Sequence, residues 1–107
     1  MTITPTHSGG AHSLMLNGEL DHHAAKTAIP EISEYIDLNL PANLILDFNS
    51  VRFMDSSGIA LIIGAYKKIT LTGGTFAVIN TSPQVYKVFA AAGICKLINI
   101  TTTHTLA

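Results

Sequence analysis

The sequence predicts an α/β domain, because segments with the pattern of strands alternate along the chain with segments that have the pattern of helices. Such alternation is typical of parallel strands joined by right-handed helical crossovers. The chain has 107 residues, which is the length of one domain with one core. Hydrophobic residues make up 48% of it and charged residues 12%, a composition that argues against a disordered chain. We therefore expect residues 1–107 to form a single domain without a linker or repeats.

Apolar spacing separates the expected strands from the expected helices. Short runs rich in apolar and β-branched residues are typical of strands, whereas apolar residues three and four positions apart indicate helices. Residues 1–10 are expected to be a loose N-terminus and 101–107 a short C-terminal tail. Between them, in chain order, we expect a strand at 11–16, a helix at 22–38, a strand at 44–48, a helix at 59–71, a strand at 75–79, a helix at 83–92 and a strand at 96–100.

The first helix carries one favourable and one unfavourable signal. Asn17-Gly18 is a turn signal after the first strand, and the side chain of Asp21 is suited to cap the helix that follows. Pro30 interrupts that helix, because a proline in a helix interior removes one hydrogen bond and clashes with the preceding turn. The helix is therefore expected to be either kinked or restarted at Pro30.

The stretch most informative about function is the junction between the strand at 44–48 and the helix at 59–71. The turn residues Asn49-Ser50 lead into it, and its sequence is Phe53-Met54-Asp55-Ser56-Ser57-Gly58-Ile59. The first N–H groups of a helix are unpaired, and the helix dipole favours negative charge there. A hydroxyl in this position can cap the helix, act as a nucleophile or accept a phosphoryl group.

The residues around the two serines disfavour a hydrolytic nucleophile. The nucleophile elbow of such enzymes has glycines two residues before and two residues after the serine. Met54 stands at that distance before Ser56, and Ser57 has Asp55 before it and Ile59 after it. No histidine can be identified as the base from the sequence. We therefore expect no enzyme activity and no catalytic residue.

Capping alone explains the junction incompletely. Asp55 or Ser56 could cap the helix, and such a cap contributes on the order of 1 kcal/mol. One cap leaves the second hydroxyl unexplained. It also leaves Gly58 unexplained, because a glycine in a helix costs about 1 kcal/mol relative to alanine. The glycine is better explained if another group approaches the start of the helix closely.

Composition and motifs argue against several other functions. The formal net charge is -1, so neither nucleic acid nor an anionic membrane is expected as a partner. No glycine-rich nucleotide-binding loop occurs. The five histidines are expected to be solvated or capping residues rather than metal ligands, and the adjacent His22 and His23 cannot both face one site on a regular element.

The expected location is the cytoplasm. The single cysteine, Cys95, allows no internal disulfide, which fits a reducing compartment. The chain opens on a polar run rather than an apolar leader. Its apolar runs are also much shorter than the roughly 20 residues that a membrane helix needs. A soluble protein is therefore expected.

The segment Phe53-Met54-Asp55-Ser56-Ser57-Gly58 resembles the signature of the bacterial anti-sigma factor antagonists, which are STAS domains. Residues 16–23 resemble a second segment of that family, and Gly73-Gly74 and 82–93 match it at later positions. The resemblance extends from residue 14 to about residue 100 and is greatest to the sporulation members of the family. It implies a mixed sheet of four to five strands with the helices packed mainly on one face.

The resemblance also implies a partner-switching mechanism. In the family, the unphosphorylated antagonist binds an anti-sigma factor that is also a serine kinase, and this frees the sigma factor. The kinase then phosphorylates the second serine of the motif, here Ser57, with ATP and Mg²⁺ that belong to the kinase, and a separate serine phosphatase reverses the modification. The chain itself would be a substrate and ligand, with no cofactor and no metal of its own.

The partner-binding residues that the resemblance implies surround the modified serine. Phosphate adds about -1.5 to -2 charges there, which changes what an apposed surface can accept. Met54 and Ile59 could supply an apolar rim or belong to the core. The expected set is Asp21, Met54, Asp55, Ser56, Ser57, Gly58 and Ile59. The alternative is a STAS-type scaffold or regulatory subunit of another signalling or transport assembly, in which no sigma factor takes part.

Overall fold

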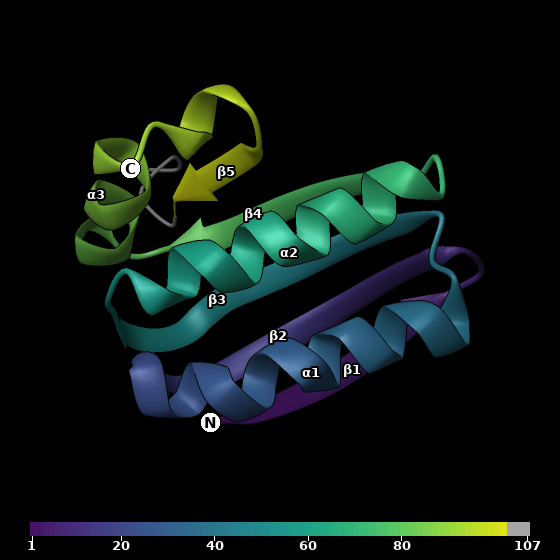
Figure 1. The fold of residues 1–107 in the computed structure, drawn as a ribbon, viewed down its shortest axis with the longest axis horizontal. Helices are drawn as coiled ribbons and strands as arrows, with labels where there is room; N and C mark the ends of the chain where they lie inside the picture. Colours follow the sequence, from purple (N-terminus) through teal and green to yellow (C-terminus); the bar gives the residue numbers. More distant parts are fainter. Residues whose placement is uncertain (103–107) are drawn as a thin grey trace.

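Five strands form one sheet in the order β1-β2-β3-β4-β5, with the helices on one face (Figure 1). This computed structural model describes residues 1–102. The elements in chain order are β1 (Thr2–Ser8), β2 (Ala11–Leu20), α1 (His22–Asn39), β3 (Asn43–Met54), α2 (Ser57–Leu71), β4 (Thr75–Thr81), α3 (Pro83–Ala91), the 3₁₀ helix η1 (Ile94–Lys96) and β5 (Asn99–Thr102). Strands β2 to β5 run parallel, and β1 runs antiparallel to β2. The predicted α/β organisation with a mixed sheet is confirmed.

The helices share one face of the sheet because each right-handed crossover steps one strand further in the same direction. α1 and α2 lie side by side in front of the sheet in Figure 1. Phe48 of β3 points to the same face, where its ring centroid lies 5.9 Å from that of Phe89 in α3. Ile32 of α1 and Ile62 of α2 belong to the same buried cluster. The core therefore fills the space between the sheet and its three helices.

The prediction of a loose N-terminus at residues 1–10 is wrong. Thr2–Ser8 forms β1, which pairs antiparallel with β2 from Thr2↔Asn17 to Ser8↔Ala11. Only Ile3 in this strand is even partly buried, so the segment lacks the apolar alternation that marks a strand in sequence. Pro5 is compatible with the strand because β1 lies at the edge of the sheet, where a missing N–H interrupts no ladder on the outer side.

The turns predicted at Asn17-Gly18 and Asn49-Ser50 lie instead inside long strands. β2 and β3 both continue through them, and β3 twice carries one more residue than β2 across the pairing. Such β-bulges bend a strand and change the direction of its side chains. The buried residues of β3 accordingly change from a spacing of two up to Phe48 to a spacing of three at Val51 and Met54.

α1 continues as one helix through Pro30, so of the two predicted alternatives the restart is wrong, and a kink stays a prediction. Its buried residues are Ala25, Ala28, Ile32 and Ile36, and their spacing keeps the helical register on both sides of the proline. Pro30 itself is exposed. The helix therefore tolerates the proline on its solvent side while its buried face holds it against the sheet.

The C-terminal strand begins later than the predicted strand at 96–100. Gly93 has a φ of 77° and ends α3, after which Ile94 and Ile98 turn into the core around η1. β5 then runs from Asn99 to Thr102 beside β4. Residues 101 and 102 of the predicted tail thus belong to a strand, whereas 103–107 lie outside the described residues.

All three crossover helices begin at the same edge of the sheet, because each follows the carboxyl end of a parallel strand. In α/β sheets this is the edge where functional groups gather. Within residues 1–102, none of the helices combines the length and the apolar character needed to cross a membrane.

Candidate phosphoacceptor site

The junction between β3 and α2 lies next to the start of α1 at this carboxyl edge (Figure 1). Asp55 and Ser56 form the connection from β3, and Ser57 is the first residue of α2. β2 and β3 are neighbouring parallel strands, so the helices that follow them begin side by side. The fold thereby brings Ser57 within reach of His22, which stands 35 positions earlier in the chain.

The carboxylate of Asp55 connects the two helix starts. Its Oδ1 accepts the backbone N–H of Ser57 at 2.8 Å, and its Oδ2 accepts the backbone N–H of His22 at 3.2 Å. Both N–H groups belong to the first residue of a helix and would otherwise lack an intrahelical partner. Of the two predicted caps for α2, Asp55 therefore supplies the hydrogen bond. Ser56 stands at the cap position, but within the described chain its side chain makes no capping bond.

These donors stabilise the charged form of Asp55. The backbone N–H of Ser57 is the main cause that lowers the pKa of the Asp55 carboxyl below its ordinary value of 3.8. Partial desolvation raises the pKa, while the Ser57 hydroxyl and the N–H and imidazole of His22 lower it further. At neutral pH the junction therefore holds a fixed negative charge beside Ser57.

The two adjacent hydroxyls of the motif lie in different surroundings. The Ser56 side chain is exposed, whereas Ser57 is half-buried and its Oγ lies 3.4 Å from Nδ1 of His22. The Ser57 Oγ does not hold the start of α2, because Asp55 bonds the backbone of that residue instead. The fold thus positions the Ser57 hydroxyl beside the Asp55 carboxylate and the His22 imidazole, and the hydrogen bond that starts α2 does not depend on it.

Asp21 has the capping role that the sequence predicts. Its Oδ1 accepts the backbone N–H of Ala24 at 2.8 Å, and it is the N-cap residue of α1. Since Asp21 directly precedes His22, its carboxylate stands at the same helix start that faces Ser57. Two carboxylates, those of Asp21 and Asp55, thereby cap neighbouring helices at one edge.

Met54 and Gly58 lie in the core of the domain, which favours the core alternative for Met54, and their part in partner binding stays a prediction. Met54 is 1% exposed. A Cβ added to Gly58 would lie 2.4 Å from both Cγ and Sδ of Met54 and 3.1 Å from Cδ2 of Leu20. The group that approaches the helix start closely is therefore the chain's own methionine. The glycine of the motif is explained by packing between β3 and α2.

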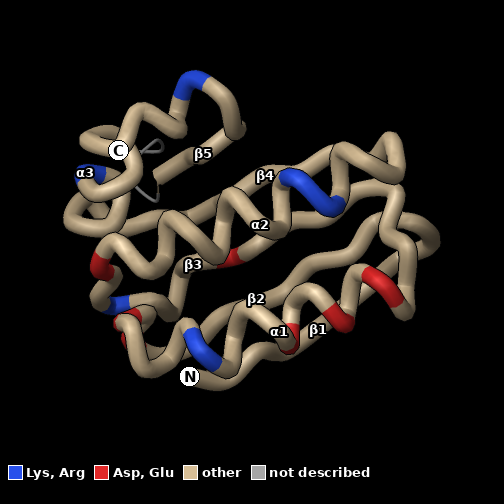
Figure 2. The backbone as a smooth tube through the Cα atoms, viewed as in Figure 1, with Lys and Arg blue, Asp and Glu red and all other residues tan. Residues whose placement is uncertain are grey.

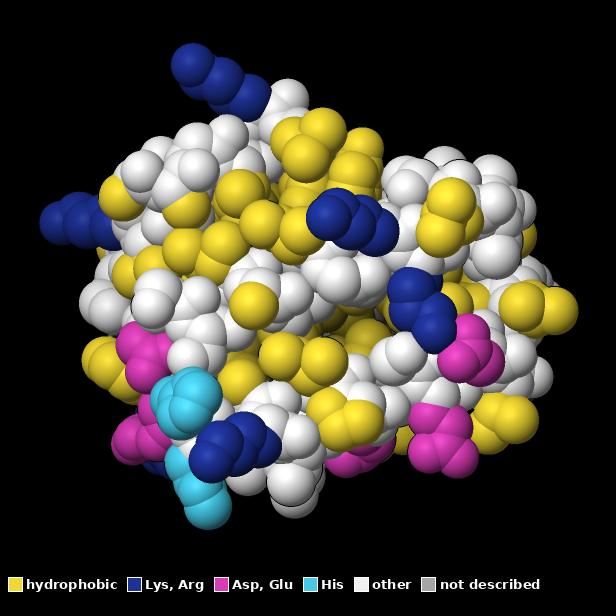
Figure 3. Space-filling model, in the orientation of Figure 1, with side chains coloured by type: hydrophobic (Ala, Val, Ile, Leu, Met, Phe, Trp, Pro, Cys, Tyr) yellow, Lys and Arg dark blue, Asp and Glu magenta, His cyan; other side chains and the backbone are white. Residues whose placement is uncertain are grey.

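Ile59 is accessible enough to contact a partner protein. It is half-buried and lines an open hollow between the start of α2 and α3. The residues that share this hollow are Ser56, Gln84, Lys87, Val88, Ala91 and Ala92. Figure 3 shows apolar side chains gathered over this face of the helices. Its use as a partner contact stays a prediction.

Two residues beside Ser57, His22 and Lys26, were not singled out as site residues by sequence reasoning, and neither was Phe53 of β3. His22 and Lys26 line a hollow between α1 and α2 together with Ser57. Phe53 is 42% exposed although it directly precedes the buried Met54. The bulges of β3 decide which of these two neighbours faces the core. No local signal announces the His22 contact, which depends on the pairing of β2 with β3.

The Ser57–His22 pair lacks the arrangement of a catalytic triad. In a triad a carboxylate holds the imidazole through its second nitrogen. Here Asp55 bonds the backbone of His22, and no hydrogen bond from the described part of the chain holds the other ring nitrogen. Among residues 1–102, no three His, Cys, Asp or Glu side chains gather in a group that could hold a metal ion.

Comparison with known proteins identifies relatives of this chain. A family model described as the STAS domain matches residues 2–107. The chain is 33% identical over 100 residues to the anti-sigma F factor antagonist of Paenibacillus polymyxa, which covers 94% of this chain and 86% of that protein.

Two solved structures of one related protein have the same fold. The anti-sigma factor antagonist SpoIIAA in its unphosphorylated form is 29% identical in sequence. The superposition has a TM-score of 0.79 and covers 98% of this chain and 92% of that chain. The Bacillus cell fate determinant SpoIIAA in the phosphorylated form is 28% identical in sequence. Its superposition has a TM-score of 0.71 and covers 98% of this chain and 96% of that chain. This relative is thus known with and without phosphorylation.

Proposed function

Because the chain belongs to the STAS domain family, we propose that it is an anti-sigma factor antagonist whose binding to an anti-sigma factor is switched off by phosphorylation of Ser57. The observation that carries this proposal is the position of the Ser57 hydroxyl. It lies at the carboxyl edge of the sheet, half-exposed, in contact with His22 and beside the charged carboxylate of Asp55. A relative that occurs in unphosphorylated and phosphorylated forms supports it.

The geometry supplies a reason why phosphorylation would change binding without unfolding the domain. Phosphate on Ser57 Oγ adds about -1.5 to -2 charges at neutral pH. The start of α2 depends on the Asp55 carboxylate and the Ser57 backbone, so a modified Oγ leaves that hydrogen bond in place. The added charge then stands beside the carboxylates of Asp55 and Asp21. A partner surface that accommodates these two would have to accept a third anionic group at the same edge.

The proposed partners follow from this switch. An anti-sigma factor that is also a serine kinase would bind the unphosphorylated edge and supply ATP and Mg²⁺, and a serine phosphatase would reset it. The chain would act as ligand and substrate and not as an enzyme. Since the kinase needs ATP and the regulated sigma factor directs transcription, the proposed place of action is the cytoplasm. The proposed partner-binding residues are Asp21, Met54, Asp55, Ser56, Ser57, Gly58 and Ile59; of these, Met54 and Gly58 are buried.

Incubation with a cognate anti-sigma factor kinase and ATP, followed by mapping of the phosphate by mass spectrometry, tests the proposal. We expect one phosphate on Ser57, none in the Ser57→Ala variant and normal modification of Ser56→Ala. Binding of the kinase should weaken after modification. Phosphate on Ser56 alone would overturn the site assignment. Phosphate on neither serine, with binding retained, would favour a scaffold that operates without this switch.

A further inference from the structure

A hollow of about 200 Å³ opens between α1 and α2 directly beside Ser57. Its walls are His22, Ala25, Lys26, Ile29, Ser57 and Ala60. We propose that His22 and Lys26 form a receptor for the phosphoryl group, so that phosphate on Ser57 is held in this hollow by the chain itself. This inference rests on the proposed phosphorylation of Ser57 and adds where the phosphate goes and what binds it.

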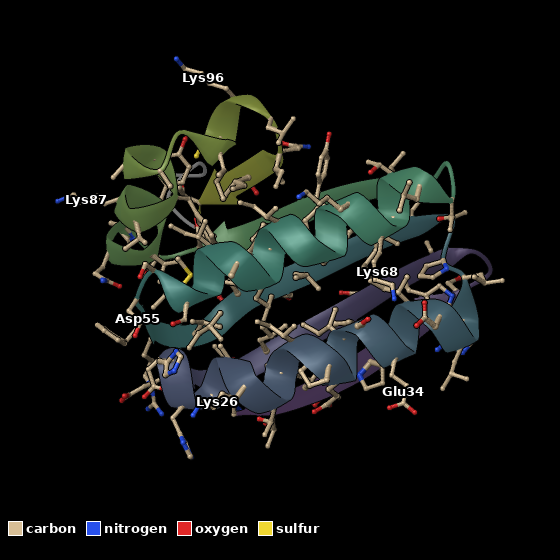
Figure 4. All side chains as sticks on the ribbon, in the orientation of Figure 1. Lys26, Glu34, Asp55, Lys68, Lys87 and Lys96 are labelled. Carbon is tan, nitrogen blue, oxygen red and sulfur yellow. The ribbon has the colours of Figure 1, made fainter. Side chains whose placement is uncertain are left out.

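Both receptor side chains come from the first turns of α1. His22 and Lys26 are four residues apart, and residues at this spacing lie above one another on one face of a helix. Nδ1 of His22 already lies 3.4 Å from Ser57 Oγ, the atom that would carry the phosphorus. Figure 4 labels Lys26 on the N-terminal part of α1 and Asp55 at the start of α2, and the two lie at the same end of the helix pair. A phosphoryl group is larger than the hydroxyl hydrogen it replaces, and the hollow offers it room toward these two nitrogens.

His22 is held in place more firmly than its exposure suggests. Its backbone N–H donates to Asp55 Oδ2 at 3.2 Å, and it is the first residue of α1 after the cap Asp21. The imidazole therefore projects from a fixed backbone position at the start of α1, within 3.4 Å of Ser57 Oγ. A preorganised donor loses less entropy when it binds an anion than a donor on a mobile loop.

The charges around the hollow favour such a receptor. Figure 2 shows acidic and basic residues close together at the starts of α1 and α2. Asp21 and Asp55 place two carboxylates beside Ser57, and His22, His23 and Lys26 are the basic groups of the same helix start. On the strands that lead here, Glu19 and Arg52 add one charge of each sign. Phosphate beside Asp55 would be repelled, and the two basic side chains that line the hollow, His22 and Lys26, offset that repulsion, whereas His23 does not line it.

The receptor would couple two titrations. Free phosphoserine has its second pKa near 6, and an unperturbed imidazole titrates near pH 6.5. An imidazolium favours the phosphate dianion, and the dianion favours the imidazolium. In the modified protein the second pKa of the phosphate should therefore fall and the pKa of His22 should rise. The phosphate would then carry its full double charge at neutral pH, fixed at the edge that a partner must cover.

The test uses protein with phosphoserine incorporated at position 57 during translation, so that no kinase is needed. The phosphate is titrated by ³¹P NMR and the His22 imidazole by ¹⁵N NMR, in the unsubstituted phosphoprotein and in the variants His22→Gln and Lys26→Gln. We expect the midpoint of the phosphate titration to rise by about half a pH unit or more in each variant. His23→Gln, which removes the adjacent histidine, should leave the midpoint unchanged.

Equal phosphate midpoints in all four proteins would overturn the receptor, as would an imidazole of His22 that titrates alike with serine and with phosphoserine at position 57. Both side chains are exposed, so the substitutions should leave the fold intact, which circular dichroism verifies. Failure of the kinase assay would refute the proposed function and leave this titration interpretable. A flat titration with normal kinase activity would refute the receptor alone.

Discussion

The carboxylate of Asp55 accepts the backbone N–H of His22 at 3.2 Å, so one side chain in front of α2 holds the first residue of α1. At the other end of the helix pair, Lys68 Nζ of α2 lies 2.8 Å from both Asp37 Oδ1 and Ser33 Oγ of α1. The two helices are therefore joined by polar contacts at both ends, with apolar packing between. Ser57, the proposed phosphoacceptor, stands at one of these joined ends, as the first residue of α2.

Replacing Asp55 by asparagine should lower the melting temperature at neutral pH. The amide keeps one acceptor oxygen but presents an NH₂ group where the second N–H donor now points, so one helix start loses its partner. Thermal unfolding followed by circular dichroism measures the change. Ser56→Ala is the matched control, because within the described chain the Ser56 side chain makes no capping bond. A melting temperature for Asp55→Asn equal to that of the control would contradict the bridging role.

The stability difference between the wild type and Asp55→Asn should depend on pH. The pKa of Asp55 is lower in the folded protein than its ordinary value of 3.8, so the unfolded chain binds a proton more readily. The contribution of the carboxylate is therefore complete above about pH 4 and is lost as the pH falls through the lowered folded pKa. Melting curves recorded between pH 7 and pH 3 should show the two proteins converging at the acid end. If the difference in melting temperature stayed constant over that range, the stabilising role of the ionised Asp55 carboxylate would be refuted.

Gly58→Ala should destabilise the domain although alanine is the better helix former. The new methyl group would lie 2.4 Å from the side chain of Met54, which is buried, and overpacking of this kind typically costs 1–3 kcal/mol, offset by about 1 kcal/mol of helix propensity. Gly64→Ala is the matched control in the same helix. Apart from its chain neighbours and the backbone of the same helix turn, no heavy atom of the described residues lies within 4 Å of its Cβ position, so this variant should be stabilised by up to about 1 kcal/mol.

Chemical denaturation of both glycine variants measures these free energies. The clash predicts coupling as well, because shortening Met54 in the Gly58→Ala background should relieve part of the strain. If Gly58→Ala is as stable as Gly64→Ala, the packing explanation for the motif glycine fails.

Met54 and Phe53 should differ in how much stability an alanine substitution removes. Met54 is 1% exposed, and replacement of a buried methionine by alanine costs about 2–5 kcal/mol. Phe53 is 42% exposed, so Phe53→Ala should cost about 1 kcal/mol or less. Chemical denaturation measures both stabilities. A loss of stability at Phe53 as large as that at Met54 would contradict the observed orientation of these two neighbours.

The sequence predicted what local patterns determine. Helix and strand alternation indicated the α/β sheet, and the polar cap at Asp21 and the serine junction were found from residue type and spacing alone. The orientation of Met54 could not be predicted, because it depends on bulges that arise only when β3 pairs with β2. The strand β1 was not predicted for a related reason. Its strand is held by backbone bonds to β2 and buries almost no side chain, so no apolar alternation marks it.

The contact between Ser57 and His22 was beyond sequence reasoning for a topological reason. The two residues are 35 positions apart and meet because β2 and β3 are adjacent and parallel, which places the helices that follow them at one edge. In the local sequence, His22 and His23 are two adjacent histidines that follow the cap residue Asp21, and nothing there sets one apart from the other. Only the strand order distinguishes it from His23.

Pro30→Ala should stabilise the domain. The helix runs through Pro30 with its buried face in register, so the substitution requires no rearrangement and gives back an N–H donor. Proline in a helix interior is about 3 kcal/mol less favourable than alanine, although loss of the ring also makes the unfolded chain more flexible by up to about 1 kcal/mol. We expect a gain of roughly 1–3 kcal/mol in the free energy of unfolding. A loss of stability would show that the proline ring makes a contact that α1 needs.

Ser57→Asp should weaken binding of the proposed kinase partner while the fold stays native. The aspartate adds one negative charge next to Asp55, and the hydrogen bond from the backbone of residue 57 to Asp55 does not depend on the side chain that is replaced. The circular dichroism spectrum and the melting temperature test the fold, and titration calorimetry tests binding. The effect should be smaller than that of phosphate, which adds about -1.5 to -2 charges. Ser57→Asn supplies a side chain of the same shape without the charge and should bind more tightly than Ser57→Asp. If both substitutions weakened binding equally, the partner would be sensitive to the shape of this edge and not to its charge. That result would refute the electrostatic basis of the proposed switch.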